Sequence, residues 1–125
     1  MPRWTISFPI EKYKATLCSR LTDWDTSYGY SAIITLYSSN RAAAYLRFKN
    51  GVGNHKDYFS GPRGQETLNI LFEEIDFDRV LALLQKEAPL FVHMRPTGQS
   101  SSNGALKYGL GSLSTDEEPV GEEES

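Results

Sequence analysis

One segment of the chain has the pattern of an amphipathic helix, and it limits the possible folds more than any other feature. Apolar residues stand at positions 77, 80, 81, 84 and 88, a spacing that places them in one stripe along a helix. Asp76 precedes the stripe as a candidate N-cap, and Pro89 follows it as a stop signal. We therefore expect one helix over residues 77–88, whose stripe must pack against another element.

The remaining segments have the pattern of strands, because apolar and polar residues alternate or because β-branched and aromatic residues dominate. Residues 38–41 read as a turn that joins two of these segments into a hairpin, and Pro96 reads as the end of another. Gly109 and Gly111 weaken the last strand. The predicted strands are residues 12–21, 30–38, 43–49, 67–75, 90–95 and 105–113.

The order of these elements is β-β-β-β-α-β-β, and most connections are short. Short connections favour antiparallel pairing, so the sequence predicts an α+β fold with a twisted antiparallel sheet of five to six strands. The helix would cover one face of the sheet and leave the other open. The polar segment 50–66 is interpreted as a loop. Its glycines, Lys56 and Arg63 do not match the phosphate-binding loop pattern.

The size and the cysteine content indicate one domain without disulfides. A chain of 125 residues is long enough to bury one core, and Cys18 is the only cysteine, which is typical of a reducing compartment. The first ten residues lack the apolar run of a signal peptide, and no window is apolar enough for a membrane helix. We expect a cytoplasmic protein that does not act at a membrane.

The charges divide the chain into two parts. Residues 1–115 hold all 13 lysines and arginines and 10 of the 16 aspartates and glutamates, a net charge of about +3. Residues 116–125 hold the other six acids and no base. We therefore predict a domain over 1–115 and a mobile acidic tail over 116–125, which could cover a basic face, bind a basic partner or only improve solubility.

Basic residues and tyrosines fall on the outward positions of the predicted strands. This combination is typical of single-stranded nucleic acid binding, in which cations follow phosphates and rings stack on bases. It also occurs on an ordinary solvated sheet face, where lysines discourage edge pairing. The candidate nucleic-acid-binding residues are Lys12, Lys14, Arg20, Tyr37, Tyr45, Arg47 and Lys49.

Other groups of reactive side chains give no catalytic or metal-binding pattern. Four acids lie within residues 73–78, but a calcium loop needs a glycine at its sixth position, which is missing here. Cys18, His55 and His93 are the candidates for a nucleophile and a base, and nothing in their spacing suggests that they meet. The sequence thus predicts no enzyme, no cofactor and no metal site.

Two resemblances add expectations. The segments Lys86–Val92 and Glu118–Glu123 resemble a group of short bacterial proteins with no assigned activity, which end in a Pro-Val-Gly-Glu-rich tail. This resemblance implies that the tail is a deliberate feature, although the chain has glutamate where the group has a second glycine. The order of four strands and a helix is also similar to Whirly-like and positive-cofactor single-stranded DNA-binding folds. That similarity carries over no residues.

The sequence as a whole predicts a non-enzymatic binding protein. Our leading hypothesis is that the open sheet face binds single-stranded nucleic acid. The alternative is a protein-interaction module, including self-assembly into a homodimer through the edge or the face of the sheet. A small-molecule binder with its site beneath the loop 51–64 is a third hypothesis.

Overall fold

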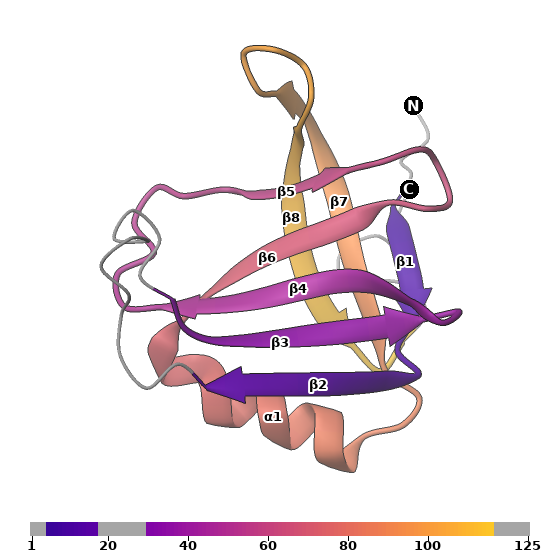
Figure 1. Cartoon of the computed structure of the whole chain (residues 1–125), viewed down its shortest axis with the longest axis vertical. Coiled ribbons are helices and arrows are strands. Elements are labelled where there is room, and N and C mark those ends of the chain that lie inside the picture. Colours follow the sequence, from indigo (N-terminus) through magenta and orange to yellow (C-terminus); the bar gives the residue numbers. More distant parts are fainter. Residues whose placement is uncertain (1–4, 18–29, 117–125) are drawn as a thin grey trace.

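A computed structural model describes residues 5–17 and 30–116, which form a sheet of eight strands and one α-helix (Figure 1). A 3₁₀ turn over Glu74–Asp76 precedes the helix. In chain order the elements are β1 (Ile6–Pro9), β2 (Lys12–Leu17), β3 (Tyr30–Ser38), β4 (Arg41–Lys49), β5 (Asp57–Ser60), β6 (Thr67–Glu73), α1 (Phe77–Lys86), β7 (Phe91–Ser100) and β8 (Lys107–Ser114).

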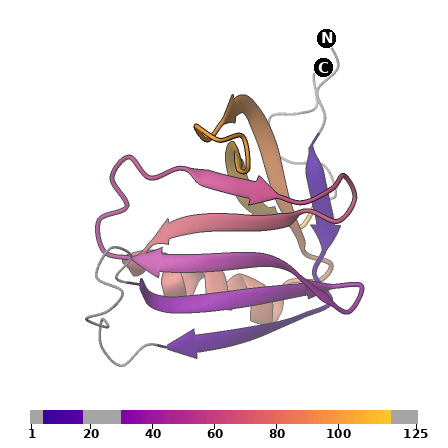
Figure 2. The same cartoon turned by 45° about the horizontal axis from the view of Figure 1, so that its top comes forward.

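The strands lie in the order β1-β7-β8-β5-β6-β4-β3-β2, and the sheet curls into a half-barrel (Figures 1 and 2). The two edge strands, β1 and β2, follow each other in the chain. Between them, the Ile10 N–H donates to the Leu90 carbonyl and the Glu11 N–H to the Tyr37 carbonyl, both at 2.9 Å. The curl therefore brings both edges of the sheet to one corner.

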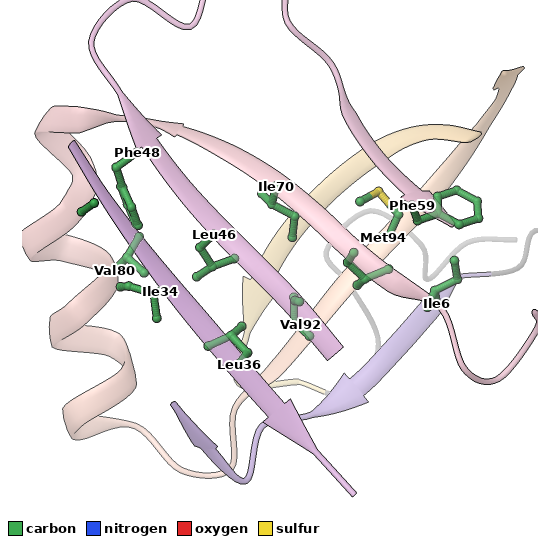
Figure 3. Close-up of a cluster of buried hydrophobic side chains, with 13 residues drawn as sticks. Ile6, Ile34, Leu36, Leu46, Phe48, Phe59, Ile70, Val80, Val92 and Met94 are labelled. Carbon is green, nitrogen blue, oxygen red and sulfur yellow. The ribbon is translucent and has the colours of Figure 1, made fainter. Parts of the chain in front are cut away.

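The inner face of the curled sheet encloses the hydrophobic core, and α1 covers its open side (Figures 1 and 3). Side chains from β3, β4, β6 and β7 meet there with Val80 of α1. The Phe48 ring joins the layers, because it stacks on Phe72 at 5.5 Å and meets the edge of Phe77 at 5.1 Å between ring centroids. The largest fully buried side chains are Phe48, Ile34, Leu36, Leu46, Leu68, Ile70, Met94, His93 and Val92.

Several predictions about local structure are confirmed. The segments 30–38 and 43–49 form the expected hairpin, β3 and β4, and the turn residues Ser39 and Asn40 both have positive φ, as a two-residue hairpin turn requires. The helix begins at Phe77 and ends at Lys86, two residues before the predicted end. Its apolar stripe packs on the core as predicted. Asp76 occupies the N-cap position but makes no side-chain capping bond.

The prediction of an antiparallel sheet with five to six strands is wrong, because the sheet is mixed and has eight strands. Two of its strands were not predicted, because each spans only four residues, too few for alternation to be recognised. β1 ends in Pro9, and β5 lies inside the polar segment that the sequence indicates as a loop. Both strands nevertheless pair with neighbours along their length.

β4 pairs with β6 in parallel. The sequence prediction did not include this pairing, because it assumed short connections and therefore antiparallel neighbours. The chain leaves β4, passes through residues 50–56 to β5, and returns through a tight connection as β6. In the sheet β6 lies between β4 and β5. It runs antiparallel to β5 and parallel to β4. The predicted topology is therefore wrong because it lacks the short strand β5.

One local interpretation near the C-terminus needs correction, because β7 does not end at Pro96 but continues through it to Ser100. Proline is tolerated there because β1 pairs only with residues 91–94, so that β7 is an edge strand at this point. Gly109 and Gly111 of β8 allow a close approach. A Cβ at Gly109 would lie 2.8 Å from the Arg95 carbonyl oxygen, and one at Gly111 would lie 2.5 Å from the Ile70 side chain.

Candidate anion-binding face

The outer face of the sheet, opposite α1, carries tyrosines and cations from five strands and from the loop before β5. Along β3 and β4 buried and half-buried residues alternate, which sends Tyr37, Tyr45 and Arg47 to the outer side. In Figure 2 the strands β2, β3, β4, β6 and β5 lie in front of α1. We call this surface the tyrosine–cation face; it comprises Lys12, Lys14, Tyr30, Tyr37, Tyr45, Arg47, Lys49, Lys56, Tyr58 and Tyr108.

The strand register explains why these side chains are neighbours. Tyr45 pairs with Asn69, Asn69 with Tyr58, and Tyr58 with Tyr108. These residues therefore form a row across β4, β6, β5 and β8. Tyr30 joins the face because a bulge after it shifts the register and places it opposite Lys49, and such bulges re-aim side chains.

Six of the seven candidate residues predicted from the sequence lie on this face. The seventh, Arg20, lies outside the residues that the structure describes. Sequence reasoning missed Tyr30, Lys56, Tyr58 and Tyr108. The sequence gives little indication of their positions. The orientation of Tyr30 depends on a bulge, and Tyr58 belongs to a strand of only four residues.

Arg47 and Lys56 of the face are held by uncharged groups. Arg47 donates to the Asn69 side-chain oxygen from Nε (3.2 Å) and from Nη2 (3.0 Å). Its guanidinium also lies 5.3 Å from the ring centroids of both Tyr30 and Tyr45. Lys56 donates to the Gln99 side-chain oxygen at 2.9 Å. These contacts fix the positions of the cations without neutralising them.

Tyrosine rings hold two of the lysines. The Lys56 ammonium lies 5.0 Å from the Tyr108 ring centroid, and the Lys12 ammonium lies 5.4 Å from that of Tyr37. Such cation–π contacts contribute about 0.5–1 kcal/mol at exposed sites. Within residues 5–17 and 30–116, the only ion pair is Arg79 with Asp76 on α1. The positive charge of the face is thus uncompensated by carboxylates of the described chain.

Two carboxylates that neighbour residues of the face, Glu73 and Asp57, are bound by backbone N–H groups instead. Both oxygens of Glu73 accept hydrogen bonds at 3.0 Å, from Gly51 and from Val52, and this fastens the start of the loop 50–56. Asp57 accepts from the Leu71 N–H at 2.9 Å and from the Gly111 N–H at 3.0 Å, which ties β6 to β8. These acids therefore stabilise the backbone and do not pair with the cations.

Burial raises the pKa of the Asp57 carboxyl above its ordinary value, although its two backbone hydrogen bonds act in the opposite direction. A raised folded-state pKa stabilises the fold below the unfolded pKa, about 3.9, and this contribution is lost as the pH rises through the folded-state pKa. We expect the free energy of unfolding of the wild type, relative to Asp57→Asn, to fall as the pH rises above about 4. Urea denaturation of both proteins across this range measures the difference. A difference that stays constant with pH would contradict the assignment.

A pocket of about 110 Å³ lies on this face, between β4, β6 and the start of β5. Arg47 and Lys49 contribute from β4, and His55 and Lys56 from the loop. None of the described residues that line it is a carboxylate. The lining residues are Tyr30, Arg47, Lys49, His55, Lys56, Tyr58, Asn69, Ile70 and Leu71.

The other reactive side chains that the sequence indicates are His93, His55, Cys18 and the acids of residues 73–78. His93 is buried, and its Nδ1 lies 2.6 Å from the Ser7 hydroxyl while its Nε2 lies 3.1 Å from the Asp116 carbonyl oxygen. His55 lies instead beside the pocket, and Cys18 is outside the described residues. No three His, Cys, Asp or Glu side chains converge among the described residues, those of 73–78 included.

The acidic tail is described only at its first residue, Asp116; residues 117–125 lie outside the described part. The contact of Asp116 with the buried His93 of β7 places the start of the tail near the β1–β7 end of the sheet. No α-helix of the described residues has the length and apolar character needed to span a membrane. Comparison of the chain with protein-family models, curated proteins and solved structures finds no match.

Proposed function

We propose that the chain is a non-enzymatic binding protein that docks an acidic segment of a partner protein on its tyrosine–cation face. The observation that carries this proposal is the setting of Arg47, which an amide and two tyrosine rings hold in place with no carboxylate partner among the described residues. A cation positioned in this way loses little conformational freedom when it binds an anion. Tyrosine and arginine are also the side chains that most often dominate protein–protein binding energy.

Single-stranded nucleic acid is the second candidate, favoured by the row of tyrosines interleaved with cations. Nucleic acid binding of this kind depends on bases that stack on exposed rings. Here a cation lies over Tyr30, Tyr37, Tyr45 and Tyr108, 5.0–5.4 Å from each ring centroid. A base would have to use the opposite ring face or displace the cation, and this favours a protein partner.

A homodimer remains an alternative protein partner. β2 has β3 as its one paired neighbour in the described sheet, and Leu17 at its end is 71% exposed. An unpaired edge can add a strand from a second copy, although the exposed Lys12 and Lys14 oppose such pairing. Light scattering over a range of protein concentrations would detect it as an increase in mass.

The proposal is tested with two labelled anions of equal charge. One is a peptide with the sequence of residues 116–125, and the other is a thymidine oligonucleotide. A peptide with amides in place of the carboxylates is the control. Fluorescence anisotropy is measured with the full chain and with a chain shortened after Asp116, whose melting temperature is compared first. The salt concentration is varied up to ~0.2 M, where surface charges are strongly screened.

We expect the acidic peptide to bind at low salt, more tightly to the shortened chain, and the amide peptide not to bind. The peptide should also bind at least as tightly as the oligonucleotide. Tighter binding of the oligonucleotide that is lost in Tyr45→Ala would instead favour nucleic acid. Absence of binding to both anions at low salt would refute both candidates.

A further inference from the structure

The pocket on the tyrosine–cation face has room for a small charged group. Its volume is about 110 Å³, while a cavity of roughly 10–15 Å³ already holds one water molecule. It is therefore large enough for a carboxylate or a phosphate group. Ile70 and Leu71 form apolar parts of its lining, which lowers the local dielectric and strengthens charge interactions.

The guanidinium of Arg47 is prepared for an oxyanion. Asn69, 9% exposed, accepts from its Nε and Nη2, while Nη1 takes no part in these bonds. Because the Asn69 side-chain oxygen is neutral, Arg47 keeps its full charge. Arginine also offers the geometry that binds carboxylates and phosphates through paired hydrogen bonds.

The rest of the pocket reinforces this preference. Lys49, His55 and Lys56 line it together with Arg47. The acid closest in sequence to Lys56, Asp57, binds the backbone N–H groups of Leu71 and Gly111. An anion in the pocket would therefore meet several cations without competition from a carboxylate among the described residues of the lining.

We propose that this pocket is a specific site for one oxyanion group, a carboxylate or a phosphate, with Arg47 as its main ligand. The inference deepens the proposed function, on which it rests, since the oxyanion would be one side chain of the docked partner. Asn69 acts through Arg47 as a positioning residue.

The site is tested by calorimetric titration of the full chain with sodium acetate and, separately, with inorganic phosphate. Asn69→Asp places a carboxylate where the neutral amide holds Arg47, and Arg47→Gln removes the charge with a shorter side chain. Lys86→Gln is the matched control, because it removes one charge from the exposed end of α1, away from the tyrosine–cation face and outside the pocket. Melting temperatures establish that each variant is folded.

We expect saturable binding of at least one anion, at least tenfold weaker in Asn69→Asp and Arg47→Gln and unchanged in Lys86→Gln. Tighter binding of acetate than of phosphate identifies a carboxylate as the preferred group, and the reverse order identifies a phosphate. Failure of both anions to bind, or equal weakening in Lys86→Gln, would overturn the site.

The outcomes also separate this site from the proposed function. If the acidic peptide binds Asn69→Asp as tightly as the wild type, the face binds the partner but the pocket is not an oxyanion site. If the small anions bind in the pocket while the acidic peptide does not bind at all, the site stands and the proposed function fails.

Discussion

Replacement of Phe48 by alanine should remove a large part of the stability of the fold. The side chain is fully buried and contacts Phe72 of β6 and Phe77 of α1. Its loss therefore leaves a cavity at the junction between sheet and helix. Phenylalanine-to-alanine changes in cores cost about 3–5 kcal/mol, while domains of this size are stable by only about 5–15 kcal/mol.

Denaturant unfolding measures this effect as a lower midpoint at similar slope. Leu110→Ala is the control, because Leu110 is 56% exposed on β8 and its truncation should change stability by no more than about 0.5 kcal/mol. An unchanged midpoint for Phe48→Ala would mean that α1 does not pack on the sheet as described.

The second large effect concerns binding. The double variant Arg47→Glu/Lys49→Glu should weaken binding of the acidic peptide by at least about a hundredfold, since each lost charged hydrogen bond costs about 1.5–3 kcal/mol. Arg79→Glu/Lys86→Glu changes the net charge equally but places it on α1, where Arg79 is 85% exposed. Because surface charges far from the ligand are screened, this control should bind almost as the wild type does. Anisotropy titrations at fixed salt compare the three proteins, and equal weakening in both variants would indicate a nonspecific charge effect.

The parts of the fold that depend on local sequence could be predicted. The stripe from Phe77 to Leu84 identified the helix, and the residues around Ser39 and Asn40 identified the hairpin turn. The sheet order could not be predicted in this way. It depends on β5, whose four residues are recognised only by their pairing with β6 and β8.

The candidate face could likewise be predicted only where it depends on local sequence. Alternation along β3 and β4 is enough to place Tyr37, Tyr45 and Arg47 on one side. The groups that hold the cations come from distant strands. Asn69 is 22 residues from Arg47 in the chain, and Gln99 is 43 residues from Lys56. A single sequence does not reveal such partners. Only the fold shows that, among the described residues, no carboxylate pairs with these cations.

The most direct measurement of the central claim is to map the bound acidic peptide on the chain. Amide chemical shifts of the ¹⁵N-labelled protein are followed while the peptide is added at low salt. We predict that the perturbed amides lie in β3, β4, β5 and β6 and in the loop 50–56, with Arg47 and its neighbours affected most. Perturbations confined to α1 and the 3₁₀ turn before it would show that the tyrosine–cation face is not the binding surface.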